Sequence, residues 1–174
     1  CGPVWEGLMM ATMDQYNNLW EGDMKGGLPL LVNVMNNQYA MGGQTRGETM
    51  GYDMLARIGA GVNADQMHAE RIDGYDPLAV IEAMGRKLDI LRSKKGPVLL
   101  DTLTYRYSGH SPSDADSYRT LEEKNAWMEH DSIMAYRAKL IKAGVASQDE
   151  FDAIDATIIE NVTNVVQMAS DPVM

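Results

Sequence analysis

Short apolar runs alternate with segments of helical periodicity along this chain. Apolar residues dominate Leu28 to Met35 and Val98 to Tyr105, and a weaker run covers Met67 to Ile72. Runs of this length that are apolar almost throughout are typical of strands buried on both faces of a parallel sheet. We therefore predict three strands, at residues 28–35, 67–72 and 98–105.

Helical patterns precede and separate these strands. Residues 7–18 are rich in Met and Ala, and a second helix, which begins near residue 54, carries Met54, Leu55 and Ile58 on one face. The best-marked helix begins at Asp76-Pro77, because Asp caps free N–H groups and Pro suits the first helical position. Its apolar spacing continues until Gly96-Pro97, which is a helix stop.

Two further helices are predicted after residue 120. Thr120-x-x-Glu123 and Ser147-x-x-Glu150 both have the pattern of a capping box, in which each residue's side chain bonds the other's backbone N–H. The last helix carries an apolar stripe, which we interpret as a packing surface, formed by Phe151, Ile154, Ile158, Val162 and Val165.

The order of these elements predicts the fold class. Strands separated by helices imply a parallel sheet with right-handed crossovers. We therefore expect an α/β fold, a parallel sheet flanked by helices, followed by a C-terminal helical hairpin. Residues 1–119 would belong to the α/β domain and residues 120–174 would be its helical extension.

Composition and charge exclude several classes of protein. The chain has 174 residues, 45% of them hydrophobic and 23% charged, as in an ordinary globular domain. The net charge of −10 argues against nucleic acid as a partner, and no run is long enough to span a membrane. The single cysteine, Cys1, allows no internal disulfide and favours a reducing, cytoplasmic setting.

Polar segments follow all three predicted strands. Ligands of open parallel sheets bind beyond the carboxyl ends of the strands, so these segments should share one rim. Asn and backbone carbonyl oxygens suit Mg²⁺ or Ca²⁺, glycines let N–H groups approach an anion, and Arg and His bind phosphate oxygens. A metal-bridged diphosphate is therefore a coherent ligand for the segments Asn36 to Gly43, Asp73 to Asp76 and Arg106 to Asp114.

Each of these residues also has a simpler explanation. An Asn-Asn pair after a strand is more often a turn, because Asn tolerates the left-handed region. His110 could be an ordinary loop residue, and Arg106 could simply pair with Asp114 or Asp116. For His68 and His130, the latter on a predicted helix, we favour structural or solvated roles. Six of the 14 methionines are expected to fill the core, namely Met9, Met10, Met13, Met50, Met54 and Met84.

Taken together, the motifs resemble the alpha chain of the thiamin-diphosphate-dependent decarboxylating component of 2-oxoacid dehydrogenase complexes. The resemblance rests on the order and spacing of several pieces over about residues 1–170. They are Leu28-Pro29, Asn36-Asn37-x-Tyr39-Ala40-Met41-Gly42, Asp73-Gly74-x-Asp76, Gly96-Pro97, Thr104-Tyr105-Arg106-x-x-Gly109-His110-Ser111 and Ser117-Tyr118-Arg119-Thr120 with Glu122-Glu123.

The resemblance implies a thiamin-diphosphate-binding fold that lacks its N-terminal part in this chain, and a set of cofactor ligands. Asn37 would bind Mg²⁺ through its side chain and Tyr39 through its backbone carbonyl, while Ala40 and Met41 would lie beside the diphosphate. The family's Gly-Asp-Gly, whose Asp is another metal ligand, would lie just before Cys1.

The resemblance also implies an activity and partners. The cofactor would decarboxylate a 2-oxoacid, with pyruvate the first choice, and the acyl group would pass to the lipoyl arm of an acyltransferase. His110 would contact the diphosphate and assist acyl transfer, and Arg106 would order its loop; both are candidate catalytic residues. A beta subunit would complete the enzyme, as two alpha and two beta chains or a fused equivalent. Ser111 and Ser117 fall where some relatives are phosphorylated.

Departures from the family pattern, which include an insertion of several residues near Trp20 to Lys25, leave alternatives open. Met35 stands where Glu is usual, Met9 where Asn is common, and Ser108 where pyruvate-specific relatives often have His. The substrate could be a branched-chain 2-oxoacid, or the protein could be another thiamin enzyme, such as a transketolase-like or acetoin-cleaving relative. A non-catalytic piece or paralogue that keeps only the fold and its interface is the alternative from another class. The expected location is the cytoplasm of a bacterium or, in a eukaryote, the mitochondrial matrix.

Overall fold

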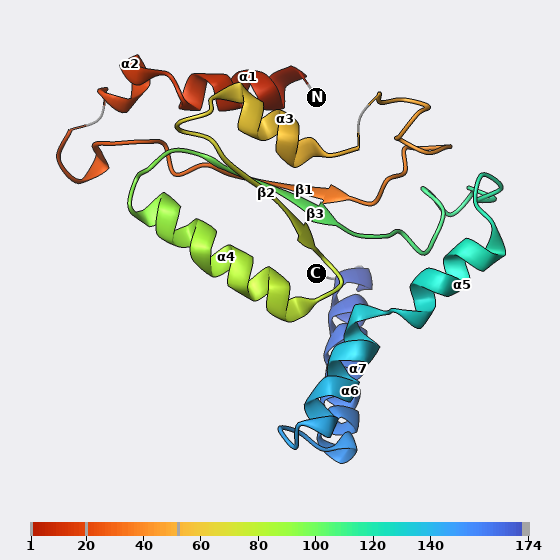
Figure 1. Ribbon diagram of the computed structural model, residues 1–174. Coiled ribbons are helices and arrows are strands. Elements are labelled where there is room, and N and C mark those ends of the chain that lie inside the picture. Colours follow the sequence, from red (N-terminus) through yellow and green to blue (C-terminus); the bar gives the residue numbers. More distant parts are fainter. Residues whose placement is uncertain (1, 20, 52, 172–174) are drawn as a thin grey trace. The chain divides into compact units, whose positions relative to one another are not determined.

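The computed structural model describes residues 2–19, 21–51 and 53–171 (Figure 1), so Cys1 lies outside the described part of the chain. In chain order the elements are α1 (Gly2–Ala11), α2 (Asp14–Asn17), the 3-10 helix η1 (Gly22–Met24), β1 (Leu31–Asn36), α3 (Leu55–Val62), β2 (His68–Asp73), α4 (Pro77–Arg92), β3 (Val98–Leu103), α5 (Leu121–Glu129), α6 (Ser132–Lys142) and α7 (Gln148–Ser170). Two compact units contain them, Cys1–His130 and Asp131–Met174.

The strands of the first unit form one sheet in the order β1-β3-β2, and the pairings of β3 with β1 and with β2 are both parallel. The predicted α/β class and parallel sheet are therefore confirmed. Helix α3 connects β1 to β2 across β3, and α4 leads back from β2 to β3. Right-handed crossovers in opposite directions must pass on opposite faces, and Figure 1 shows α3 and α4 on opposite faces of the sheet.

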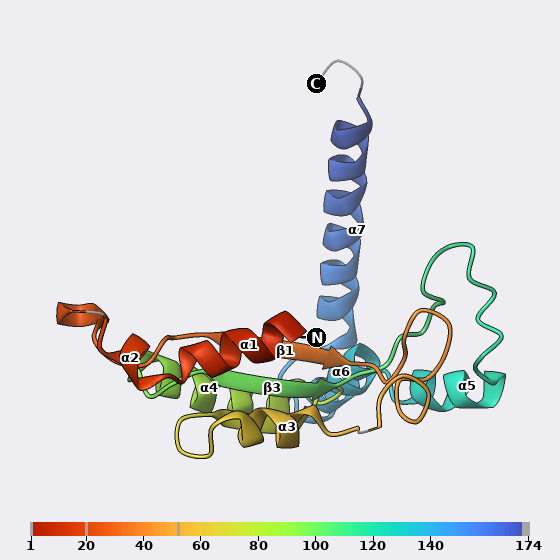
Figure 2. The same ribbon diagram turned by 90° about the horizontal axis from the view of Figure 1, so that it is seen from above.

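The core lies on both faces of the central strand β3. Val98, Leu99 and Leu100 are fully buried. Val98 and Leu100 pack against Ile72 and against α4, whereas Leu99 faces the other way, toward α1 and α3. Figure 2 shows α1 and α3 alongside the strands when the sheet is seen from above. The alternation of buried side chains explains why the sequence of β3 is apolar on both faces.

The prediction of one continuous helix over residues 7–18 is wrong. The structure has α1 and α2 instead, separated at Thr12 and Met13. The Thr12 hydroxyl donates to the carbonyl oxygens of Leu8 and Met9, at 3.2 and 3.0 Å, and Met13 has an extended backbone. Side-chain bonds of this kind compete with the helical backbone ladder and bend or end helices.

Three helices, not two, follow residue 120 in the described chain. The predicted helix through His130 is wrong, because α5 ends at Glu129 and His130 is its C-cap. Asp131 then caps α6, since its carboxylate accepts from the N–H groups of Ile133 and Met134, both at 3.0 Å. The capping box of α7 is confirmed between Ser147 and Glu150.

Several apolar side chains that were assigned to packing are exposed. Met9, Met10, Met13 and Met54 are exposed, while Met84 is half-buried and packs against the core. On α7, four members of the predicted stripe each expose more than half of their surface, namely Ile154, Ile158, Val162 and Val165. The sequence pattern thus predicted α4 and α7, but it did not predict which apolar side chains are buried.

Candidate functional site

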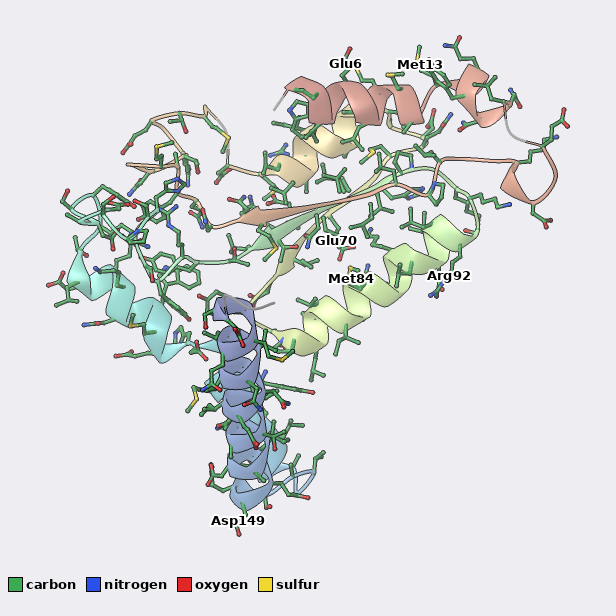
Figure 3. All side chains as sticks on the ribbon, turned by 180° about the vertical axis from the view of Figure 1, so that it is seen from behind. Glu6, Met13, Glu70, Met84, Arg92 and Asp149 are labelled. Atoms are coloured by element: carbon green, nitrogen blue, oxygen red, sulfur yellow. The ribbon has the colours of Figure 1, made fainter. Side chains whose placement is uncertain are left out.

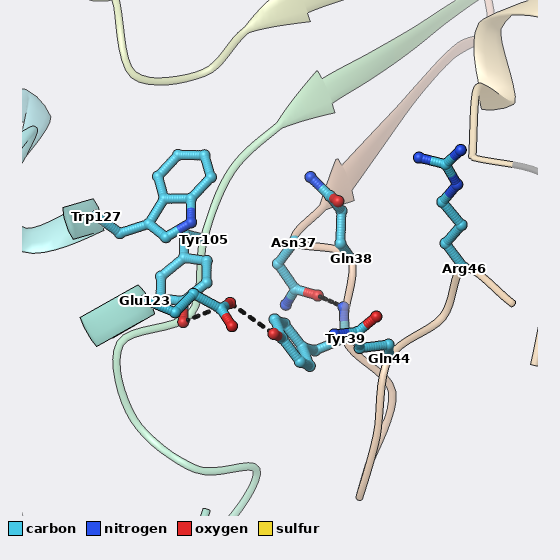
Figure 4. A pocket seen from close by; sticks show the side chains of 8 residues that line it. All are labelled: Asn37, Gln38, Tyr39, Gln44, Arg46, Tyr105, Glu123 and Trp127. Atoms are coloured by element: carbon cyan, nitrogen blue, oxygen red, sulfur yellow. Dashed lines mark hydrogen bonds between the residues drawn. The ribbon is translucent and has the colours of Figure 1, made fainter. Parts of the chain in front are cut away.

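A pocket of about 240 Å³ lies beyond the carboxyl ends of β1 and β3 (Figure 4). The segment after β1 supplies one side and the segment after β3, with α5, the other. The lining residues are Asn37, Gln38, Tyr39, Gln44, Arg46, Tyr105, Glu123 and Trp127. Two predicted site residues, Asn37 and Tyr39, are therefore in the lining.

Asn37 begins a tight turn that brings Tyr39 into this pocket. Its side-chain oxygen accepts a hydrogen bond from the Tyr39 backbone N–H at 3.0 Å (Figure 4), and Gln38 between them has a positive φ of 63°. A turn therefore follows the Asn-Asn pair as expected, but Gln38, and not an Asn, has the left-handed backbone. An amide oxygen has two lone pairs, so this bond leaves Asn37 able to accept a second contact.

Arg106 joins the segment after β3 to the segment after β1. Its Nη2 donates to the Ala40 carbonyl oxygen at 3.2 Å and to the Tyr118 hydroxyl at 2.8 Å. The Tyr118 hydroxyl in turn donates to Asp114 Oδ2 at 2.7 Å. The guanidinium therefore reaches Asp114 through a tyrosine and fixes the position of Ala40. Its Nε is buried and has no acceptor among the described residues.

His110 is exposed, and its backbone N–H donates to Asp114 Oδ2 at 2.7 Å. It is not among the named lining residues of the pocket, so the structure places its loop, but not its ring, in the network that reaches Ala40. Hydrogen bonds from the backbone N–H groups of His110 and Asp116, together with the Tyr118 hydroxyl, lower the pKa of Asp114 to about 2. Asp114 is therefore ionised at physiological pH.

Arg119 is the buried centre of the loop between β3 and α5. Its guanidinium pairs with Asp116 at 2.6 Å and donates to the carbonyl oxygens of Arg106 and Ser108. It also lies over three tyrosine rings, with centroids 5.1 to 5.6 Å from its Cζ atom, namely Tyr39, Tyr105 and Tyr118. The Arg119 guanidinium thus bonds the two ends of the loop together and packs the loop against the tyrosines of the pocket.

Glu123 connects α5 to the pocket rather than completing a capping box. Its backbone N–H bonds the Thr120 hydroxyl, as predicted, but its carboxylate accepts from the hydroxyls of Tyr39 and Tyr105, at 2.5 and 3.0 Å. Burial and these bonds to Glu123 raise the pKa of both tyrosines above their usual range. Both therefore remain neutral donors at physiological pH.

The segment after β2 reaches the same edge of the sheet. The Gly74 N–H donates to the Leu103 carbonyl at 2.9 Å, and the Tyr75 ring lies 5.1 Å from the Trp127 ring. Trp127 stacks on Tyr105 at 5.0 Å and 9°. All three segments that follow the strands therefore meet at one rim, as the parallel topology predicts.

The remaining predicted site residues have other surroundings. Met41 is 71% exposed. A Cβ on Gly43 would collide with the Glu48 carboxylate, so an acidic group occupies the space beside this glycine. His68 Nε2 lies 3.1 Å from the Lys95 carbonyl oxygen, a structural contact of the kind we favoured for it.

Two acidic residues that organise the site were not among its predicted members. The roles of Glu123 and Asp101 were not predicted, although Asp101 stands in the apolar run of the third strand. A carboxylate within a buried strand needs a polar partner. That signal could have identified Asp101, whereas the partners of Glu123 depend on the tertiary fold alone.

Comparison with known proteins agrees with this architecture. The sequence model of the family described as "Dehydrogenase E1 component" matches residues 2–173. This chain belongs to the dehydrogenase E1 component family. It is 36% identical over 173 residues to a pyruvate dehydrogenase E1 component subunit alpha of Rhizobium meliloti (strain 1021), a match that covers 98% of this chain and 45% of that protein. The family indicated by the sequence motifs is thereby confirmed.

Other relatives have the same relation to the chain. A pyruvate dehydrogenase E1 component subunit alpha of Porphyra purpurea is 30% identical over 168 residues, which cover 97% of this chain and 44% of that protein. The somatic, mitochondrial form of this subunit from Bos taurus is 33% identical over 174 residues, which cover 98% and 40%. The chain spans less than half the length of these relatives. No helix in its described part is both long and apolar enough to cross a membrane.

Proposed function

We propose that this chain forms part of the alpha subunit of a thiamin-diphosphate-dependent 2-oxoacid dehydrogenase, with pyruvate as the first-choice substrate. The observation that carries the proposal is the Asn37–Tyr39 turn, which lines a pocket at the carboxyl edge of a parallel sheet. Membership of the dehydrogenase E1 component family and similarity to pyruvate dehydrogenase alpha subunits support it.

The residues present fit a Mg²⁺-bridged diphosphate. The Asn37 side chain and the Tyr39 backbone carbonyl offer the hard oxygen ligands that Mg²⁺ prefers. The described residues contain no group of three His, Cys, Asp or Glu side chains that could hold a metal ion, so these two oxygens carry the metal proposal. The buried Nε of Arg106 has no acceptor among the described residues, so this guanidinium, which contacts the Ala40 carbonyl, retains unused donor capacity.

In this proposal each residue has a defined task. Asn37 and Tyr39 would hold the metal, Ala40 and Met41 would lie beside the diphosphate, Arg106 would keep the two loops together and His110 would contact the diphosphate. Thiamin diphosphate, when bound, supplies the carbon nucleophile that decarboxylates the 2-oxoacid. The chain's own contribution is to bind, orient and exclude water.

We further propose that the enzyme passes its acyl group to a lipoyl-bearing acyltransferase and requires a beta subunit. The exposed apolar stripe of α7 supports a protein partner, because contiguous exposed apolar surface commonly marks an interface. We expect the complex in the bacterial cytoplasm or the mitochondrial matrix.

The proposal is tested on the full-length polypeptide purified with its beta partner. Calorimetry with thiamin diphosphate and Mg²⁺ should show that Asn37→Ala weakens binding by about ten-fold or more. Asn33→Ala is the matched control, because it makes the same change on β1, where Asn33 contacts Thr102 instead of the pocket. Equal affinities for the two variants would remove Asn37 from the site.

Two further measurements separate the alternatives. Turnover with a panel of pyruvate, branched-chain 2-oxoacids and acetoin identifies the substrate class. His110→Ala should lower acyl transfer to lipoyl more than it lowers cofactor affinity. No cofactor binding by the complex of unmodified chains would favour the non-catalytic alternative.

A further inference from the structure

Asp101 is a fully buried carboxylate in the middle of the central strand β3. It follows Val98, Leu99 and Leu100, which are buried completely and are apolar. A carboxylate in such surroundings loses its hydration, and it is tolerated only where hydrogen bonds and a counter-charge replace the water. Its contacts therefore indicate which parts of the structure Asp101 stabilises.

Those contacts run across all three strands on one face of the sheet. Asp101 Oδ2 accepts from Arg71 Nε on β2 at 2.9 Å, and Oδ1 accepts from Asn36 Nδ2 on β1 at 2.8 Å. Arg71 and Asp101 are direct partners in the parallel register. Asn36 is the last residue of β1, so the row reaches the rim where the pocket begins.

Both ends of the connection between β1 and α3, residues 37–54, meet at this carboxylate. One end is Asn36, and at the other the Ala56 N–H, in the first turn of α3, donates to Asp101 Oδ2 at 3.3 Å. The carbonyl oxygen of Asp53 is held by the guanidinium of Arg71 and, at 3.4 Å, by the amide of Asn36. The connection that carries Asn37 and Tyr39 is thus closed at its base by one polar cluster.

The same cluster sets the start of the pocket turn. The amide of Asn36 uses its Nδ2 for Asp101, so its Oδ1 must point the other way, where it accepts from the Gln38 N–H at 3.3 Å. Because an amide has one donor end and one acceptor end, the carboxylate of Asp101 decides which end faces the turn.

We propose that Asp101 is a positioning residue for the metal-binding turn. By accepting from Asn36 it orients that amide, and by accepting from Arg71 and the start of α3 it fixes the far end of the connection. With both ends of the connection fixed, Asn37 and Tyr39 would keep their positions in the lining of the pocket. This inference rests on the proposed function, because the role of the turn is to hold Mg²⁺ and diphosphate.

Asp101→Asn is the informative substitution, because it keeps the shape and removes one acceptor. If the new amide oxygen stays with Arg71, its NH₂ group faces the NH₂ of Asn36. Asn36 must then rotate and would point a donor at the Gln38 N–H. In the full-length complex we expect thiamin diphosphate affinity in Mg²⁺ to fall by about ten-fold or more. We also expect hydrogen exchange at residues 38–51 to accelerate before any cofactor is added.

Rescue and control variants separate positioning from a general loss of stability. Exchanging the pair, as Asn36→Asp with Asp101→Asn, restores a carboxylate facing an amide, and we expect affinity to return to within about three-fold of the unmodified protein. Glu70→Gln is the matched control. Glu70 neighbours Arg71 on β2 but points to the opposite face (Figure 3), where it pairs with Arg86 on α4. We expect it to lower stability and leave affinity unchanged.

The outcomes distinguish failure of the positioning role of Asp101 from failure of the proposed function. Unchanged affinity and exchange in Asp101→Asn, or an equal loss of affinity in Glu70→Gln, overturns the inference while the proposed function stands. Failure of the unmodified complex to bind the cofactor overturns both. If Asp101→Asn does not fold, Asn36→Ala tests the same 2.8 Å bond without opposing two donors, and unchanged affinity in that variant overturns the inference.

Discussion

Replacing Arg119 by methionine should release the loop between β3 and α5. The Arg119 side chain is fully buried, and its guanidinium pairs with Asp116 and donates to the carbonyl oxygens of Arg106 and Ser108. Methionine retains much of the apolar stem but none of these bonds. The loop that contains His110 would therefore lose its internal support and its contact with the tyrosines of the pocket.

The size of the effect follows from these contacts. Removing one partner of a buried ion pair costs about 3–5 kcal/mol. Asp116 keeps its ion pair with Lys124 at 3.1 Å, which favours the lower end. We therefore expect the free energy of unfolding to fall by about 3 kcal/mol. Arg119→Lys keeps the charge but not the planar fork that reaches three acceptors, so about half of that loss is expected.

Urea unfolding followed by circular dichroism measures the free energy of unfolding. Calorimetry with thiamin diphosphate and Mg²⁺ measures whether the cofactor affinity of the pocket changes. Arg137→Met is the matched control, because Arg137 pairs with Asp155 at 2.9 Å and lies 5.0 Å from the centre of the Phe151 ring, both within the second unit. It should lower stability without changing affinity. Unchanged unfolding in Arg119→Met, or an equal effect of both variants on affinity, would show that Arg119 does not support the loop.

Three further predictions concern stability and are measured by urea unfolding. Hydrogen bonds from Arg86, and then from Lys87, lower the pKa of Glu70 to about 2, so its stabilisation is complete above about pH 4.5 and is lost as the pH falls toward 2. Because Arg86 is half exposed, Glu70→Gln should cost about 2 kcal/mol at pH 7 and almost nothing at pH 2; a pH-independent difference would contradict this. In Gly74→Ala the new Cβ would lie 2.5 Å from the carbonyl oxygen that ends β3, and we expect a loss of about 1–3 kcal/mol; wild-type stability would show that the segment yields easily. Ser147→Ala removes the cap of α7 and should cost about 1 kcal/mol, which a threonine at the same position should largely restore.

The fold could be predicted from the sequence because its signals are local. Each predicted apolar run corresponds to a strand. However, β1 begins at Leu31 instead of residue 28, and β3 ends at Leu103 instead of residue 105. Asp76 caps α4 as expected, with its carboxylate accepting from the Leu78 N–H at 3.0 Å. Capping residues and periodicity act within a few residues, so they can be recognised without knowledge of the rest of the molecule.

The site could be predicted only as a set of segments. Parallel topology alone places the ends of β1, β2 and β3 at one edge, so the sequence indicated where the polar segments after these strands would meet. It could not indicate that Arg106 would contact Ala40, 66 positions away. Nor could it indicate that the Glu123 carboxylate would accept hydrogen bonds from two tyrosines instead of completing the capping box. Such choices depend on which acceptors the folded chain brings within about 3 Å.

The family, the three strands and the rim at which polar segments gather could all be recognised from the amino-acid sequence. How those segments are held in place depends on the folded molecule, where buried Asp101 and Arg119 bond to them. The physical reason is that apolar periodicity is repeated along the chain and averages over many residues. A buried charge, in contrast, is satisfied by a few specific atoms, such as Asn36 and Arg71 around Asp101, and their positions depend on the whole fold.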